Sequence, residues 1–426
     1  MVLFISLIFI VGYAAIALEH PLKINKAATA LVTAAVCWAI FALLTPDKNF
    51  AVHYLSEHLG EVAGILFFLL GAMTIVELVD AHDGFEIITS KIKTTNKKKL
   101  VWLVGTITFF LSAALDNLTT TIVIISLLRK LMPDRKDRLL FTGLVVVAAN
   151  AGGAWSPIGD VTTTMLWIGG QITTGAIITQ TFLPSLVCFL VPAFVISRRI
   201  NGNVEKPVIA EKNINFTTSS RERNTVFWLG IGSLLFVPVF KTITHLPPYM
   251  GILFGLGIMW IITEMIHSGK DEEEKGVLSV NHALRKIDTP SILFFLGILL
   301  SIAALQATGV LNNLATWMNS TIGNINIITM TIGLLSAVVD NVPLVAAAQG
   351  MYSMEQYPTD HYFWPFLAYC AGTGGSALII GSAAGVAAMG LEKIEFFWYI
   401  KNITWLALIG YFAGAAVFIA QHYLLF

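Results

Sequence analysis

The chain has 426 residues, of which 56% are hydrophobic and only 12% are charged, and its formal net charge is zero. Soluble domains carry about 25% charged residues, so this composition excludes an ordinary soluble protein and indicates a polytopic helical membrane protein. Without a basic face to neutralise phosphates, no nucleic-acid partner is expected. The three cysteines, Cys37, Cys188 and Cys370, lie singly in apolar runs and do not have the spacing of a metal site.

The N-terminal apolar run, residues 1–18, is interpreted as a retained first helix. It has no cationic segment before it, and Glu19-His20-Pro21 follows instead of a small-residue cleavage site. The other apolar runs of membrane-spanning length are 27–44, 60–79, 139–172, 177–197, 225–244, 249–267, 290–306, 362–390 and 403–424. We therefore expect an all-α fold that crosses a lipid bilayer many times.

Two related polar motifs interrupt apolar stretches in the two halves of the chain. They are Leu111-Ser-Ala-Ala-Leu-Asp-Asn-Leu-Thr-Thr-Thr121 and Leu335-Ser-Ala-Val-Val-Asp-Asn-Val-Pro343. A charged side chain at membrane depth costs about 2.5–3.5 kcal/mol on insertion scales. The repeated carboxylates, Asp116 and Asp340, are therefore candidates for function.

The segment around Asp116, residues 100–131, has basic flanks on both sides. The flanking residues are Lys91, Lys93, Lys97, Lys98 and Lys99 before it and Arg129, Lys130, Arg135, Lys136 and Arg138 after it. Short flanks rich in Lys and Arg stay in the cytoplasm, so the segment enters and leaves on one side. Each arm of about 16 residues reaches only roughly 24 Å as a helix. We interpret the segment as a re-entrant helical hairpin with Asp116 at its tip.

The second copy, 324–354, has flanks of the opposite kind. No Lys or Arg occurs between Ile287 and Glu392, and Glu355 and Asp360 follow the copy. A hairpin that opens to the outer side is expected, with the chain's two ends outside. The prediction is an inverted-topology repeat with halves 1–199 and 225–426 joined by a cytoplasmic linker, 200–224.

Two long apolar runs, 139–172 and 362–390, are predicted to be interrupted helices. The first contains Asn150-Ala-Gly-Gly-Ala-Trp-Ser-Pro-Ile-Gly-Asp160, and the second contains the related Gly372-Thr-Gly-Gly-Ser-Ala-Leu-Ile-Ile-Gly-Ser382. Proline removes a backbone donor and glycine weakens a helix, so both runs should unwind there. Unwound backbone at this depth must line a cavity or be buried in protein. The break in the first run would expose backbone carbonyls and side-chain oxygens, and oxygen ligands suit a hard cation such as sodium.

These motifs resemble those of the NhaD-type sodium/proton antiporters, a family of the ion transporter superfamily, over essentially the whole chain. The resemblance rests on Leu115-Asp-Asn-Leu-Thr-Thr-Thr121, Asn150 to Thr164, Val339-Asp-Asn-Val-Pro343 and Gly372-Thr-Gly-Gly-Ser376. It implies two re-entrant hairpins, two interrupted helices, a homodimer, a multi-pass location in the cytoplasmic membrane and an elevator-like movement. It implies no cofactor, only transported Na+ or Li+ and H+.

The resemblance also implies a set of cation- and proton-binding residues. They are Asp116, Asn117, Thr119, Asn150, Ser156, Asp160, Thr162, Thr163, Ser336, Asp340, Asn341, Ser376 and Ser382. Sodium and a proton would compete for the same negative charge, so that binding of one displaces the other. We expect Asp116 and Asp160 to be the shared acceptors and Asp340 to be a third carboxylate in or beside the site.

Other interpretations remain at this point. Asp116 and Asp340 could serve only as helix N-caps. The same scaffold could carry an organic anion or oxyanion, although no Lys or Arg is expected near either hairpin tip. An intramembrane protease built on Asp116 and Asp160 would need Gly at Pro157, where its Gly-x-Gly-Asp signature begins, and would leave Asp340 without a purpose. A channel would conduct without coupling.

Overall fold

A computed structural model describes residues 1–89, 94–204 and 218–425 of the chain. Within these ranges the regular structure is helical, apart from one isolated bridge between Asn96 and Asn203. Seven of the described helices are long and apolar enough to cross a membrane: Lys26–Leu44, Lys48–Ala81, Thr174–Arg199, Ser220–Thr244, Pro248–Ile266, Thr289–Ala307 and Phe396–Leu424. The predicted all-α, multi-spanning class is confirmed. Lys91, Lys93 and positions 205–217 of the predicted linker lie outside the described residues.

The helices divide between the two halves of the chain. The first half contains α1 (Val2–Ala17), α2 (Glu19–Leu22), α3 (Lys26–Leu44), α4 (Lys48–Ala81), α5 (Glu86–Thr89), α6 (Lys97–Ala114), α7 (Asn117–Leu131), α8 (Arg135–Gly153), α9 (Val161–Ile168) and α10 (Thr174–Arg199). The second contains α11 (Ser220–Thr244), α12 (Pro248–Ile266), α13 (Glu272–Leu278), α14 (Val280–Lys286), α15 (Thr289–Ala307), α16 (Val310–Thr321), α17 (Ile325–Leu335), α18 (Asn341–Met351), α19 (Phe363–Gly374), α20 (Ala383–Glu392), α21 (Phe396–Tyr399), a π-helical turn (Ile400–Thr404) and α22 (Trp405–Leu425).

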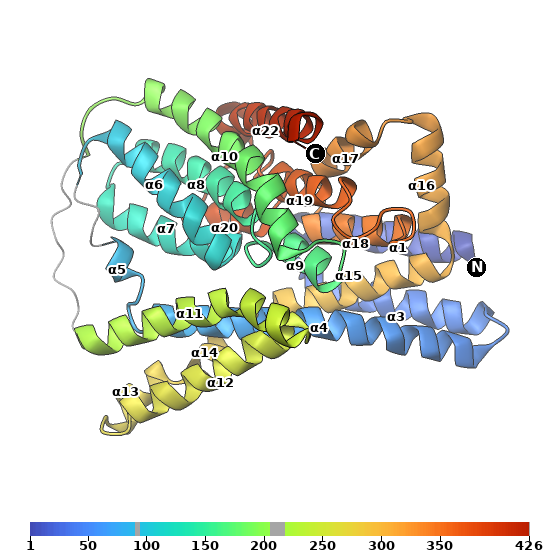
Figure 1. The fold of residues 1–426 in the computed structure, drawn as a ribbon, viewed down its shortest axis with the longest axis horizontal. Coiled ribbons are helices and arrows are strands. Elements are labelled where there is room, and N and C mark those ends of the chain that lie inside the picture. The colour runs from blue at the N-terminus through green and yellow to red at the C-terminus, as the bar shows by residue number, and fades with distance from the viewer. Residues whose placement is uncertain (90–93, 205–217, 426) are drawn as a thin grey trace.

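The long helices form two layers (Figure 1). In the lower layer α3, α4, α11 and α12 run side by side, and in the upper layer α6, α7, α8 and α10 pack with α19, α20 and α22. Helix α15 packs on α3 and α4 and also contacts α18, so it joins the layers. Helices α15 and α3 approach closely at Gly297 because glycine has no Cβ. A Cβ there would lie only 2.5 Å from the backbone of Ala30.

Two elements differ from the expectation of plain spanning runs. Helix α4 begins at Lys48, not near residue 60, because Asp47 caps its start and the polar residues that follow remain helical. Helix α16 was not predicted. Its 12 residues mix apolar and polar side chains, and Leu314 and Trp317 are exposed, a pattern too short and too polar to be read as a span.

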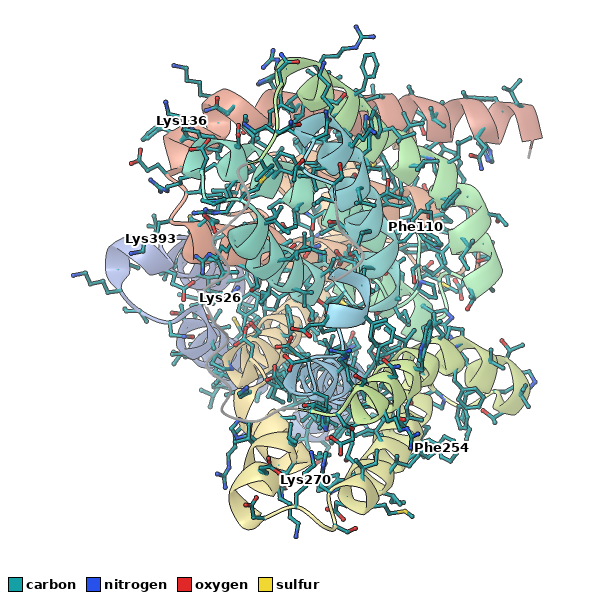
Figure 2. The ribbon with its side chains drawn as sticks, turned by 90° about the vertical axis from the view of Figure 1, so that its left-hand side faces the viewer. Lys26, Phe110, Lys136, Phe254, Lys270 and Lys393 are labelled. Atoms are coloured by element: carbon teal, nitrogen blue, oxygen red, sulfur yellow. The ribbon has the colours of Figure 1, made fainter. Side chains whose placement is uncertain are left out.

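Basic residues gather at one end of the molecule. Figure 2 looks onto the left-hand end of Figure 1, and Lys26, Lys136, Lys270 and Lys393 are labelled there. The ammonium of Lys97 forms an ion pair with Asp137, so the start of α6 lies beside the start of α8. Lys97 and Lys136 belong to the flanks that the sequence analysis expects on the cytoplasmic side.

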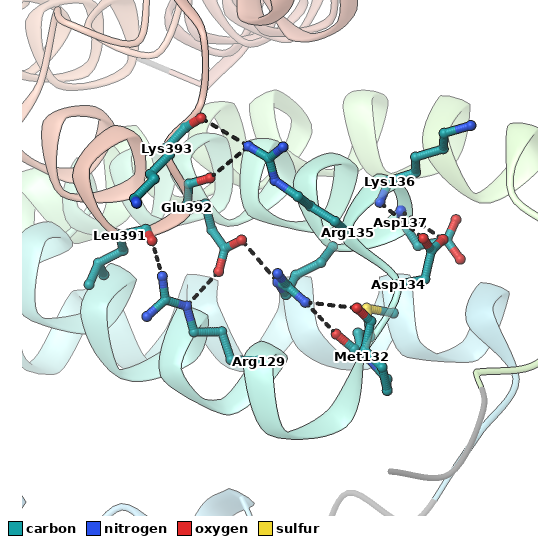
Figure 3. A network of polar contacts seen from close by, with 11 residues as sticks. Arg129, Met132, Asp134, Arg135, Lys136, Asp137, Leu391, Glu392 and Lys393 are labelled. Carbon is teal, nitrogen blue, oxygen red and sulfur yellow. Dashed lines mark hydrogen bonds and ion pairs between the residues drawn. The ribbon is translucent and has the colours of Figure 1, made fainter.

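At this end a buried carboxylate joins the two halves (Figure 3). Glu392, at the end of α20, accepts from Arg129 Nε at 2.7 Å and from Arg138 Nε at 2.9 Å, and its side chain is 2% exposed. Arg135 donates to the carbonyl of Lys393 at 3.1 Å. The arginines that the sequence marks as a cytoplasmic flank therefore also hold the end of α20 in place.

Two histidines connect α4 and α12 near the same end. His82 Nδ1 lies 2.6 Å from the Leu78 carbonyl and therefore donates its proton there, which leaves Nε2 to accept from His267 Nε2 at 2.8 Å. Only one proton lies between the two Nε2 atoms, so the two rings cannot both be positively charged. Burial lowers the pKa of His267 to about 4 and also lowers the pKa of His82.

We predict that Glu392→Ala destabilises the protein. Removing one partner of a buried ion pair leaves uncompensated charge and costs about 3–5 kcal/mol; the lower figure applies because Arg129 is 46% exposed and can be rehydrated. Thermal unfolding in detergent should show a lower midpoint. Glu395→Ala, which removes an exposed acid three residues away, is the control and should unfold as the wild type does.

We also predict acid-sensitive stability from the histidine pair. Unfolded histidine titrates near 6.5, whereas His267 titrates at about 4, so the unfolded chain binds more protons between these values. Stability should be fully present above pH 6.5 and should fall as the pH drops towards 4. His267→Gln should flatten this dependence, and His245→Gln, at an exposed position, should not. Identical slopes for the two variants would contradict the assignment.

Candidate cation site

Asp160 lies at the break between α8 and α9, where it caps the first turn of α9. The carboxylate is 2% exposed. Its Oδ1 accepts from both the backbone nitrogen and the hydroxyl of Thr162 at 2.8 Å, and the Thr163 hydroxyl donates to the Asp160 carbonyl at 2.9 Å. These contacts follow from the sequence, because Asp is a favoured N-cap and Thr in the first turn presents both donors to it.

Asparagines from both of the repeated motifs reach the same carboxylate. Asn117 Nδ2 donates to Asp160 Oδ2 at 2.6 Å, and Asn341 Nδ2 lies 3.3 and 3.4 Å from the two oxygens. Each follows the repeated aspartate in its motif, Asp116 or Asp340. A buried carboxylate is thus surrounded by neutral donors from α7, α9 and α18, with no cation beside it among the described residues.

Asn150 extends the network into the second interrupted helix. Its Oδ1 accepts from Asn117 at 3.0 Å, and its Nδ2 donates to Ser376 and Ser382 at 2.9 Å each. The two serines lie on either side of the break between α19 and α20. The network therefore brings together most of the predicted residues, namely Asn117, Asn150, Asp160, Thr162, Thr163, Asn341, Ser376 and Ser382.

Asp116 and Asp340 each cap their own helix beside this network. Asp116 is half-buried and accepts from the backbone nitrogen of Thr119 at 2.7 Å and from its hydroxyl at 2.8 Å. Asp340 accepts from Val342 N at 3.2 Å. Both residues therefore have the capping role considered above, and each immediately precedes an asparagine that donates to Asp160.

Ser336 and Ser156 have structural contacts instead. The Ser336 hydroxyl donates to the Ala371 carbonyl at 2.9 Å, and the Ser156 hydroxyl accepts from Ile158 N at 3.4 Å. The structure shows no contact between either side chain and a carboxylate. In the described ranges, moreover, no three His, Cys, Asp or Glu side chains gather in a metal-binding group, so the three aspartates are neighbours without forming a closed cage.

The expectation of no Lys or Arg near the hairpin tips is wrong. Lys26, at the start of α3, places its ammonium 3.8 Å from Asp340 Oδ2. The two residues are 314 positions apart, so only the packing of the two halves brings them together, and no sequence pattern could reveal it. Both line a cavity of about 1030 Å³ between α1, α3 and α15 on one side and α18 and α20 on the other.

Comparison with known proteins shows the family of this chain. Residues 13–367 match the family model described as CitMHS, citrate transporter. Sodium/proton antiporter 1 of Arabidopsis thaliana is 51% identical over 425 residues, which cover 99% of this chain and 73% of the relative. Sodium/proton antiporter 2 of the same plant is 46% identical, covering 98% and 99%. The Na(+)/H(+) antiporter NhaD of Alkalimonas amylolytica is 29% identical, covering 96% and 88%. The chain therefore belongs to the citrate transporter family and, within it, to the NhaD-type sodium/proton antiporters.

Proposed function

We propose that this protein, a transporter and not an enzyme, exchanges Na+ or Li+ for H+ across its membrane. The observation that carries the proposal is Asp160, a buried carboxylate whose donors are neutral amides and hydroxyls. Such a group needs a positive partner to remain charged, and either a cation or a proton can supply it. Since the two compete for one charge, binding of one drives release of the other.

We propose that Asp116 and Asp160 are the shared acceptors and that Asp340 is the third carboxylate of the site. Three neighbouring acids titrate as a set, so no single pKa would describe the exchange. The hydroxyls of Thr120 and Thr121 support oxygen ligation in this region, because both are buried and have no hydrogen-bond partner among the described residues. The other predicted residues would serve as ligands or orient the carboxylates.

We propose that this site is built by an inverted-topology repeat, with halves 1–199 and 225–426 joined by the linker 200–224, and with hairpins at 100–131 and 324–354. Several contacts recur in both halves and support this. Ser112 donates to the Ala149 carbonyl at 2.6 Å as Ser336 does to that of Ala371. A Cβ at Gly152 would lie 2.2 Å from the Phe109 carbonyl oxygen, and one at Gly374 would lie 1.9 Å from that of Gly333.

We further propose a homodimer in the cytoplasmic membrane, with the upper layer moving against the lower one. The bacterial relatives named NhaD favour that membrane. Cell fractionation and the mass of the detergent-solubilised protein test these two points.

A carrier of an organic anion is the second candidate, favoured by Lys26 beside the site and by the citrate transporter family model. Three aspartates without further cations near them would repel such a substrate. In vesicles containing a pH-sensitive dye, a panel of Na+, Li+, K+ and Ca2+ should give a response to Na+ or Li+. A response to citrate or arsenite alone would favour the anion carrier.

We predict that Asp160→Asn or Asp116→Asn reduces Na+-dependent collapse of an imposed pH gradient in proteoliposomes to background. The amide keeps the shape of the side chain but can neither bind a proton nor balance a cation. Glu395→Gln, at an exposed position, should retain wild-type exchange. Wild-type exchange by either aspartate variant would reject the assignment of that residue.

A further inference from the structure

The charge of each site carboxylate is balanced differently. Asp116 accepts from the nitrogen and hydroxyl of Thr119, and the Asp160 carboxylate accepts from two amides, one hydroxyl and a backbone nitrogen. Within the ranges that the structure describes, Asp340 alone of the three has an ion-pair partner, the ammonium of Lys26. The site therefore already contains one cation, and that cation belongs to the protein.

The Lys26–Asp340 pair is held in place but is weak. The ammonium also lies 4.5 Å from the centre of the Phe294 ring, and the backbone nitrogen of Lys26 donates to Glu19 at 3.1 Å, which fixes the start of α3. At 3.8 Å the ammonium and the carboxylate form an ion pair without a direct hydrogen bond. Both side chains are partly exposed, Lys26 by 29% and Asp340 by 21%, so a hydrated cation can reach Asp340.

The pair also lies between the cavity and the buried carboxylate. Lys26 and Asp340 line the cavity, and Asn341, the residue after Asp340, donates to both oxygens of Asp160. A cation that enters from this cavity therefore meets Asp340 before Asp160. A cation that binds Asp340 there competes with the ammonium for the charge of the same carboxylate.

We propose that Lys26 is a tethered competitor of the transported cation: its ammonium occupies Asp340 when the site is empty and is displaced when Na+ binds. This deepens the proposed antiport function and rests on it. The lysine would set the apparent affinity for sodium, because binding must overcome the ion pair.

Replacing Lys26 should therefore make sodium bind more tightly. Exposed or partly exposed ion pairs contribute modestly, so Lys26→Met should lower the Na+ concentration for half-maximal exchange by roughly two- to fivefold. Lys26→Arg should behave as the wild type does, because it retains the charge. Lys23→Met is the matched control, since Lys23 lines the same cavity and the structure gives it no ion pair.

The experiment combines exchange in proteoliposomes with Na+-dependent thermal stabilisation of the detergent-solubilised protein, both at alkaline pH, where protons compete least. The stabilisation assay reports binding without transport. In an Asp340→Asn background, Lys26→Met should cause no further change in Na+ affinity.

Three results would overturn the assignment. They are an unchanged or weaker Na+ affinity in Lys26→Met, an equal shift in Lys23→Met, or an undiminished effect of Lys26→Met in the Asp340→Asn background. Lys26→Gln repeats the test if the Met variant does not fold. Absence of Na+-dependent exchange in the wild type would instead overturn the proposed function, and the stabilisation assay would still test Lys26 separately.

Discussion

The site depends on a carboxylate, that of Asp160, which is buried without a counter-charge among the residues that the structure describes. Asp160 is satisfied by a backbone nitrogen, a threonine hydroxyl and the amides of Asn117 and Asn341. Neutral donors can fix the position of a carboxylate, but they do not balance its charge. The elements that converge here, the tips of two broken segments and the breaks in two helices, are the parts of the chain where backbone polar groups are also open. The need to supply hydrogen-bond donors to the buried Asp160 carboxylate thus explains both the irregular backbone and the polar residues beside it.

The two halves contribute unequally to this arrangement. The first half supplies Asp160 and Asn150, whereas the second supplies Ser376 and Ser382 at the corresponding break. The related backbones allow the same close crossings, with glycine where a Cβ would strike a carbonyl oxygen. Because only the first half has a carboxylate at its break, the site has one buried charge, that of Asp160, and asparagines of both halves contact it. At the end of α20 the halves are connected again, through the ion pairs of Glu392 with Arg129 and Arg138.

The sequence was informative wherever the physical signal was local. Apolar runs located the spanning helices, and Gly, Pro and Asp located the breaks: α8 ends at Gly153 and α9 starts after Asp160. Eight of the predicted site residues also form one network, because their motifs sit at those breaks. Contacts between segments that are distant in the chain could not be predicted from the sequence. Lys26 begins α3 without a distinguishing sequence pattern. Arg129 and Arg138 have the pattern of an ordinary cytoplasmic flank, and only the fold places Glu392 between them. Helix α16 and the start of α4 were missed because their polar residues hide them from a search for apolar spans.

Competition between sodium and protons for the same acids can be measured without transport. Sodium should be added to the purified protein in weakly buffered detergent solution, and the protons released should be followed with a pH-sensitive dye. Saturable release of protons that is lost in Asp160→Asn would agree with the account. Sodium binding that releases no protons from the wild-type protein would contradict it.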